Sequence, residues 1–209
     1  MSGRTIIVTG TDTDIGKTVF AAALAGALGA SYWKPVQAGL EDGSDAGTVA
    51  RLGGVAPAQI LPEAYRLQTP CSPHRAAEID GIGIEIDRLA LPQVDGSLIV
   101  EGAGGVLVPV TRDLLFADLF ARWAKPVVLV ARTGLGTINH SLLSVEALRA
   151  RGVPILGIAF VGDSVEDSEA TIAAMGGVKR LGRLPHLAPL DAATLRAAFL
   201  AHFDMEDFR

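Results

Sequence analysis

The sequence predicts an α/β fold in which a doubly wound, mainly parallel sheet carries helices on both faces. Short apolar runs recur along the chain, and they are continuous rather than alternating, which is typical of strands buried on both faces. Helix-like stretches separate these runs, and an alternation of strands and helices favours a parallel sheet. Pro126 and Pro154 mark two of the points at which an expected helix gives way to an expected strand.

The expected elements follow one another along the whole chain. Strands are expected at 5–10, 31–36, 97–104, 126–131, 155–161 and 180–185, and helices at 17–28, 115–123, 139–150, 165–175 and 191–202. Residues 37–96 contain scattered Gly and Pro with weak periodicity, so we expect short helices and loops there, built over a site. The sequence shows no internal repeat, low-complexity tract or linker, and we expect residues 1–209 to form a single domain.

The composition excludes several classes of protein. A chain of 209 residues with 49% hydrophobic content can bury a large core. The net charge of -5 does not favour binding to nucleic acid or to an anionic membrane surface. Cys71 is the single cysteine, which indicates a reducing compartment. The apolar run 19–30 is too short to cross a bilayer, so we expect a cytoplasmic protein with no membrane partner.

The stretch TGTDTDIGKTVF, residues 9–20, places Gly16-Lys17-Thr18 between an expected strand and an expected helix. A glycine-rich turn in this position directs backbone N–H groups and the helix N-terminus at an anion. The ending is that of a phosphate-binding loop, although five residues rather than four separate Gly10 from Gly16. In such loops the lysine reaches the β- and γ-phosphates and the hydroxyl binds Mg²⁺. The sequence therefore predicts a P-loop NTPase-like fold with a nucleotide site.

Further polar residues are expected at the same edge, because ligands of doubly wound sheets bind at the carboxyl ends of the strands. Glu101 ends the apolar part of the expected strand 97–104, where its carboxylate could coordinate Mg²⁺, and Lys34 closes the run SYWK. The residues alone also allow a solvated Glu101, a surface Lys34 packed against aromatic neighbours, and Asp45 as an ordinary acid of a first helical turn.

Two shorter stretches carry weaker signals. In CSPH, Ser72 and Pro73 suit the cap and the first position of a helix, and Cys71 suits a small buried hydrophobe. His74 is open between a structural role and a ligand contact. Asn139 could cap the expected helix that it begins, or bind an anion there.

Seven segments together resemble the motifs of the dethiobiotin synthetase family, in order TGTDTDIGKT, YWKPVQAG, SDA, SPH, VEGAGG, LGTINH and GRLP. The resemblance covers residues 5 to about 187. It implies an ATP-dependent cyclo-ligase of biotin biosynthesis that closes the ureido ring of dethiobiotin from CO₂ and 7,8-diaminononanoate (7,8-diaminopelargonate). The route runs through a carbamate and a carbamic-phosphoric anhydride. Mg²⁺ is the implied cofactor, ATP the cosubstrate, and a homodimer with the substrate between subunits the implied assembly.

The resemblance also implies roles for individual residues of this sequence. Lys17 and Lys34 would be catalytic, and Thr18, Asp45 and Glu101 would hold the metal. The nucleotide would contact Asp14, Ile15, Gly16, Lys17, Thr18, Val19, Asp45, Glu101, Gly102, Gly104, Gly162, Pro185, His186 and Leu187. The other substrate would contact Thr13, Lys34, Ala38, Ser72 and Asn139.

The sequence departs from the family pattern at two places and keeps one alternative open. Ala38 stands where the family usually has a hydroxyl residue, and Val161 and Gly162 stand where it tends to have an asparagine that reads adenine. The preference for one nucleotide base therefore stays open. The alternative function is a nucleotide-switched partition or regulatory P-loop ATPase. Asp12 argues against it, because that class carries a signature lysine at this position of the loop.

Overall fold

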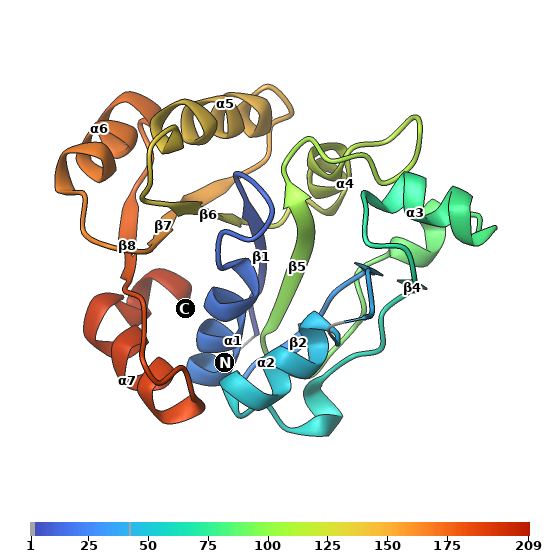
Figure 1. Ribbon diagram of the computed structural model, residues 1–209, viewed down its shortest axis with the longest axis horizontal. Helices are drawn as coiled ribbons and strands as arrows, with labels where there is room; N and C mark the ends of the chain where they lie inside the picture. Colours follow the sequence, from blue (N-terminus) through green and yellow to red (C-terminus); the bar gives the residue numbers. More distant parts are fainter. Residues whose placement is uncertain (1–2, 42) are drawn as a thin grey trace.

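A six-stranded parallel sheet forms the centre of the computed structural model, which describes residues 3–41 and 43–209 (Figure 1). The strands, in spatial order, are β2 (Ser31–Trp33), β5 (Leu98–Gly105), β1 (Thr5–Gly10), β6 (Val127–Arg132), β7 (Ile155–Val161) and β8 (Arg180–Leu184). From β1 the chain passes first to the edge strand β2, returns to β5 beside β1, and then continues outward through β6, β7 and β8 on the other side, which confirms the predicted doubly wound sheet.

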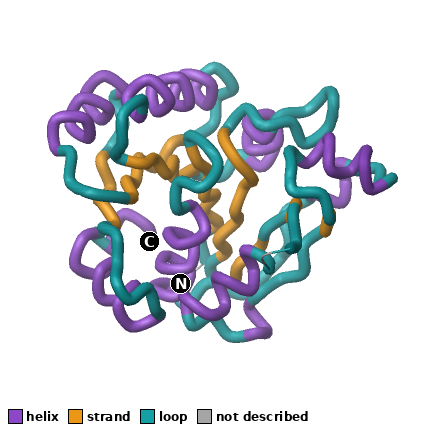
Figure 2. Tube along the Cα trace, in the orientation of Figure 1, coloured by secondary structure: helices purple, strands orange, loops and turns teal. Residues whose placement is uncertain are grey.

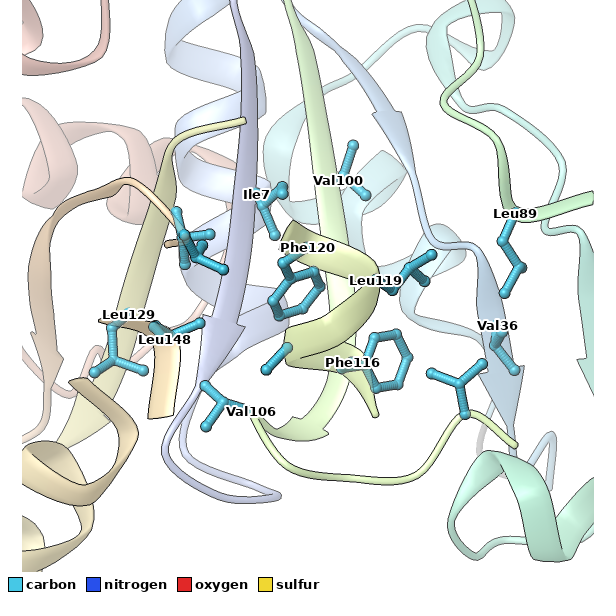
Figure 3. Packing of buried hydrophobic residues seen from close by; sticks show 14 of the residues in the cluster. Ile7, Val36, Leu89, Val100, Val106, Phe116, Leu119, Phe120, Leu129 and Leu148 are labelled. Carbon is cyan, nitrogen blue, oxygen red and sulfur yellow. The ribbon is translucent and has the colours of Figure 1, made fainter. Parts of the chain in front are cut away.

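Helices cover both faces of this sheet (Figures 1 and 2). One face carries α1 (Lys17–Leu28), α2 (Asp45–Gly53) and α7 (Ala192–His202), and the other carries α4 (Phe116–Trp123), α5 (Thr137–Arg149) and α6 (Glu166–Gly176). Successive residues of β1 point to opposite faces, so that Ile6 and Val8 pack with α1 while Ile7 packs with α4. Figure 3 shows Phe120 of α4 lying beside Ile7, and Phe116 of the same helix in the same cluster. In the described ranges, no helix combines the length and apolarity needed to cross a bilayer.

The expected strand at 31–36 is wrong, because the chain forms two strands there. β2 ends at Trp33, and β3 (Val36–Ala38) pairs instead with β4 (Tyr65–Leu67) in a separate two-stranded parallel sheet. Pro35 lies between them, and a proline has no N–H with which to continue a ladder of hydrogen bonds. The remaining expected strands and helices are confirmed within two residues at each end.

The segment 37–96 contains the short helices expected there, together with the unexpected strands β3 and β4. Its helices are α2 and α3 (Pro73–Asp80), and its 3₁₀ turns are η1 (Pro57–Gln59) and η2 (Ile86–Leu89), while a third turn, η3 (Met205–Phe208), follows α7. In Figure 1, α3 and β4 lie beyond β2, at the edge of the main sheet.

Helices α1 and α2 touch through their backbones. A Cβ built on Gly26 would lie 2.2 Å from the carbonyl oxygen of Gly53, and one built on Gly53 would lie 2.5 Å from that of Ala22. Only glycine allows so close an approach. Since Thr18 lies in the first turn of α1 and Asp45 begins α2, this contact helps to fix the distance between these two polar side chains.

We expect Gly26→Ala to lower the free energy of unfolding by about 1–2 kcal/mol. Alanine gains up to about 1 kcal/mol in helix propensity, but a side chain forced into a packed contact costs about 1–3 kcal/mol. Urea denaturation measures the change. Gly47→Ala is the matched control, because Gly47 is an exposed residue of α2 whose added Cβ would meet only the Ser44 hydroxyl, at 3.5 Å. Equal stability of the two variants would contradict the backbone contact.

Candidate functional site

A cavity of about 880 Å³ opens where β1, β2 and β5 end and α1 begins. Many of the residues expected in a site line it, namely Thr13, Asp14, Ile15, Gly16, Lys17, Thr18, Val19, Lys34, Ala38, Asp45, Ser72, Glu101 and Gly104. The carboxyl ends of parallel strands share one edge of a sheet, which is why segments far apart in the sequence meet here.

The loop between β1 and α1 has the backbone of an anion-binding turn. Gly16 caps α1 with a φ of 92°, and a Cβ on it would lie 2.8 Å from Cγ1 of Val161, so both conformation and space require glycine. Asp14 also has a positive φ, of 54°. The Lys17 ammonium donates to the carbonyl oxygen of Asp12, inside the loop. Thus the helix N-terminus and an ammonium group both lie at this end of the cavity.

Burial controls the charge of Lys17. Its side chain is almost completely enclosed, and burial lowers the pKa of its ammonium to about 8, against the opposing attraction of the Glu101 carboxylate. The neighbouring Lys34 ammonium lowers this pKa further. An added anion such as a phosphate would favour the charged form of Lys17.

Four side chains meet beside this loop, and we call Thr18, Lys34, Asp45 and Glu101 the polar cluster. The Thr18 hydroxyl lies 2.9 Å from Oδ1 of Asp45 and 2.8 Å from Oε1 of Glu101. The Lys34 ammonium forms ion pairs with Oδ2 of Asp45 and, at 3.2 Å, with Oε1 of Glu101. Lys34 is 4% exposed and Glu101 is 1% exposed. The alternative interpretations of Lys34 as a surface lysine and of Glu101 as a solvated carboxylate are therefore both wrong.

The polar cluster holds opposite charges together, with Lys34 and Glu101 buried and Asp45 partly exposed to the cavity. Burial alone would lower the pKa of Lys34, but the Glu101 and Asp45 carboxylates outweigh it and raise that pKa. Burial alone would raise the pKa of Asp45, but the Lys34 ammonium outweighs it and lowers that pKa. Asp45 is also the first residue of α2, next to the Ser44 cap. Its carboxylate therefore stabilises the helix N-terminus and also takes part in the polar cluster.

The oxygen atoms of the polar cluster fit a small divalent cation. A hydroxyl has one proton, so Thr18 can donate to only one of the two carboxylates that it faces, and the other carboxylate oxygen keeps a lone pair with which to accept a cation. Carboxylate and hydroxyl oxygens are ligands that Mg²⁺ accepts. In residues 3–41 and 43–209 no three His, Cys, Asp or Glu side chains gather as a metal site, so phosphates and water would have to complete the coordination.

Gln37 and Tyr32 belong to the site although the sequence did not single them out. Oε1 of Gln37 accepts from the Asp45 N–H at 3.1 Å, and its Nε2 donates to the Gly39 carbonyl at 3.1 Å. The Tyr32 hydroxyl donates to Oε2 of Glu101 at 2.8 Å. Tyr32 stands two residues before Lys34 in an extended run, and residues with this spacing project to the same side of a strand. This spacing was the one feature of the sequence that could have placed Tyr32 in the site.

The stretch before α3 corrects one expectation. Cys71 is exposed and lines the cavity, so a buried hydrophobe is wrong, because the turn that carries it lies at the cavity rim. Ser72 and Pro73 occupy the expected cap and first helical positions. The Ser72 hydroxyl lies 3.1 Å from Nδ1 of His74, and His74 lines a separate pocket of about 220 Å³.

Some expected residues lie outside the lining of this cavity, namely Gly102, Gly162, Pro185, His186, Leu187 and Asn139. Gly102 faces the core, where a Cβ would lie 2.9 Å from Phe120. Asn139 is an exposed residue in the first turn of α5, but the cap of that helix is Gly136, so the capping alternative is wrong.

Gly162 and His186 lie together on the other side of the phosphate-binding loop. A Cβ on Gly162 would lie 3.7 Å from Nε2 of His186, and the preceding Val161 packs against Gly16. The Gly162 N–H donates to the Leu184 carbonyl at 3.0 Å, and its own carbonyl accepts from Arg183 at 3.3 Å. Both backbone groups of Gly162 therefore have a partner within the protein, and its carbonyl oxygen keeps a second lone pair.

Comparison with solved structures agrees with the architecture. The chain is similar to the septum site-determining protein MinD with Mg-ADP from Pyrococcus horikoshii, with a TM-score of 0.56, 14% identity, and coverage of 95% of this chain and 86% of that one. It is also similar to a ParA family ATPase from Chlorobium tepidum, with a TM-score of 0.51, 12% identity, and coverage of 96% and 92%. At such low identity these likenesses show the P-loop ATPase fold alone.

Sequence comparison is far more specific. Residues 4–194 match the family model described as an AAA domain. The protein named ATP-dependent dethiobiotin synthetase BioD is 68% identical in Novosphingobium aromaticivorans, over 97% of this chain and 98% of the relative. Proteins of the same name are 66% identical in Rhodopseudomonas palustris, over 97% of each chain, and 60% identical in Brucella anthropi, over 98% and 97%. These relatives cover nearly the whole chain, and the P-loop and the polar cluster agree with their name. The chain therefore belongs to the family of ATP-dependent dethiobiotin synthetases.

Proposed function

We propose that residues 1–209 form one domain that closes the ureido ring of dethiobiotin from 7,8-diaminononanoate, CO₂ and ATP, with Mg²⁺ as cofactor. The observation that carries this proposal is the buried polar cluster, which meets the phosphate-binding loop in one cavity. A partition or regulatory switch is not favoured, because the relatives at 60–68% identity carry the synthetase name.

The reaction builds negative charge at the place where the cations lie. One amine attacks CO₂ to give a carbamate, whose oxygen attacks the γ-phosphate and displaces ADP. The second amine then attacks the carbamoyl carbon, and phosphate leaves as the ring closes. Lys17 and Lys34 would oppose the charge on the carbamate and on the transferring phosphoryl group. Because Lys34 is fixed by two carboxylates, it needs little reorganisation as charge develops.

The metal, the nucleotide and the diamine would each occupy a different part of the cavity. Thr18, Asp45 and Glu101 would hold Mg²⁺, which supplies charge stabilisation at the phosphates when bound. The β- and γ-phosphates would lie on the loop Asp14 to Val19, and the nucleoside would extend past Val161 toward Gly162 and His186. The diamine would lie over Ala38 and Ser72, which line the same cavity.

We also propose a homodimer that acts in the cytoplasm, with Asn139 of one subunit binding the substrate carboxylate of the other. Asn139 is exposed at the N-terminus of α5, which suits an anion, yet it lies outside the cavity of its own chain.

The activity itself is tested by incubating the protein with the diamine, bicarbonate, Mg²⁺ and ATP. Formation of dethiobiotin, detected by mass, and phosphate release that depends on the diamine would support the proposal. ATP turnover at the same rate without the diamine would favour the switch alternative.

Lys34→Ala should reduce turnover about 10²–10³-fold, the usual effect of removing one preorganised electrostatic group. Lys125→Ala is the matched control, because Lys125 is exposed, and it should retain near-normal turnover. Steady-state kinetics measure both, and thermal unfolding verifies that each variant is folded. Normal turnover by folded Lys34→Ala would remove this lysine from the chemistry.

The affinity for ADP is measured by calorimetry in EDTA at a series of pH values. The part of its pH dependence that is due to Lys17 should be absent below pH 8, and above pH 8 the affinity should fall as the pH rises. Below pH 8 Lys17 is charged before and after binding, whereas above pH 8 binding must take up a proton. The loss should approach about tenfold per pH unit until the pKa of the complex is reached. Lys17→Met should lack this slope, and an equal slope in both proteins would contradict the assignment to Lys17.

Asn139→Ala and Lys17→Ala chains should each be inactive or impaired alone, but mixing them should restore activity. A mixed dimer contains one site in which both residues are intact, so up to about half of the sites in such a dimer recover. Native mass spectrometry shows whether mixed dimers form. Mixed dimers without recovered turnover would refute a site shared between subunits.

A further inference from the structure

Tyr32 places a hydroxyl group against the side of Glu101 that faces away from the other members of the polar cluster. Its ring lies in the apolar core beneath α1 and α2, with no exposed surface. Its hydroxyl donates to Oε2 of Glu101 at 2.8 Å. A buried tyrosine hydroxyl requires a partner, and here the partner is a carboxylate that is itself 1% exposed.

The two oxygens of Glu101 therefore have different neighbours. Oε1 lies 2.8 Å from the Thr18 hydroxyl and 3.2 Å from the Lys34 ammonium, whereas Oε2 receives the Tyr32 hydroxyl. Since Glu101 is enclosed, water cannot easily replace a lost donor at Oε2, and an unpaired buried oxygen is unfavourable. The carboxylate is thus held in one orientation, with Oε1 toward the cavity.

Short strand β2 and the residue after it supply both contacts to this carboxylate. Tyr32 pairs with Ile99 in the parallel register, two residues before Glu101 on β5. Tyr32 and Lys34 are two residues apart in an extended segment, so their side chains project to the same side. One edge of the sheet therefore brings a neutral donor to Oε2 and a cation to Oε1.

We propose that Tyr32 is a positioning residue that orients Glu101 so that a single oxygen, Oε1, faces the Mg²⁺ of the bound nucleotide. This inference rests on the proposed function, because it takes Glu101 as a ligand of that ion. Mg²⁺ demands near-octahedral geometry at about 2.0–2.1 Å, so a carboxylate free to turn is a poorer ligand. Hydrogen-bonded partners of ligating carboxylates commonly account for about 10–100-fold in metal affinity.

The test compares ADP binding with Mg²⁺ and with EDTA in Tyr32→Phe, by calorimetry. The ratio of the two dissociation constants measures how strongly the metal and the nucleotide bind together. Tyr32→Phe should reduce this ratio about tenfold or more, with little change in EDTA. Tyr65→Phe is the matched control, because Tyr65 is also buried and its hydroxyl accepts from the Glu85 N–H at 2.8 Å, outside the cluster.

The outcomes separate the two proposals. A wild-type ratio near one would overturn the metal role in the proposed function and this inference with it. A large wild-type ratio that persists within about twofold in folded Tyr32→Phe would overturn this inference alone. A loss of equal size in Tyr65→Phe would also overturn it, because the effect would then be a general consequence of removing a buried hydroxyl.

A second measurement avoids any dependence on the folding of Tyr32→Phe. The chain contains two tyrosines, so protein labelled with 3-fluorotyrosine gives two ¹⁹F signals, and Tyr65→Phe identifies that of Tyr32. Adding Mg²⁺ to the ADP complex should shift the Tyr32 signal and leave the Tyr65 signal in place. A Tyr32 signal that does not move would show that the hydroxyl does not sense the metal, and it would overturn the proposal.

Discussion

The site depends on keeping Glu101 paired while it is buried. A carboxylate that is almost fully enclosed at a strand end is strongly unfavourable unless charge and hydrogen bonds compensate it. Lys34, Thr18 and Tyr32 supply this compensation from three different segments of the chain. The arrangement is costly to disturb from any side, because removal of one partner leaves the others buried and unsatisfied.

The scaffold brings these groups together by close packing. The backbone contact between α1 and α2 sets Thr18 against Asp45, and Gln37 fixes the first N–H of α2 from the end of β3. The break at Pro35 matters here, because it releases the chain from the main sheet directly after Lys34. The chain can then form the separate β3–β4 pair, which brings Gln37 and Ala38 into the cavity.

The fold by itself does not identify the reaction. The MinD protein of Pyrococcus horikoshii and the ParA family ATPase of Chlorobium tepidum share the P-loop architecture at only 14% and 12% identity, so the scaffold alone does not decide what this chain does. In this chain the site is built from the side chains at the strand ends and in the loop. Asp12 lies in the loop, and Lys34, which follows β2, is bound to two carboxylates.

The sequence by itself determined the doubly wound sheet, the helices, the phosphate-binding loop and the family, because these depend on local patterns. Continuous apolar runs, a Gly-Lys-Thr ending and ordered motifs are readable without knowing what packs against them. It also indicated that Lys34 and Glu101 share one edge, since strand ends in such a sheet converge, whereas Asp45 was joined to them only by the family resemblance.

Only the tertiary structure decided which side chains contact one another and how deeply they are buried. The split of 31–36 into two strands, the exposure of Cys71 and the place of Gly102 against Phe120 all depend on neighbours distant in sequence. The contact between Tyr32 and Glu101 also depends on distant neighbours, because the sequence pattern around Tyr32 predicts only a buried core side chain. Its hydroxyl finds a carboxylate 69 residues away only when β2 and β5 lie side by side. Local patterns fix the elements, whereas burial and pairing are properties of the assembled chain.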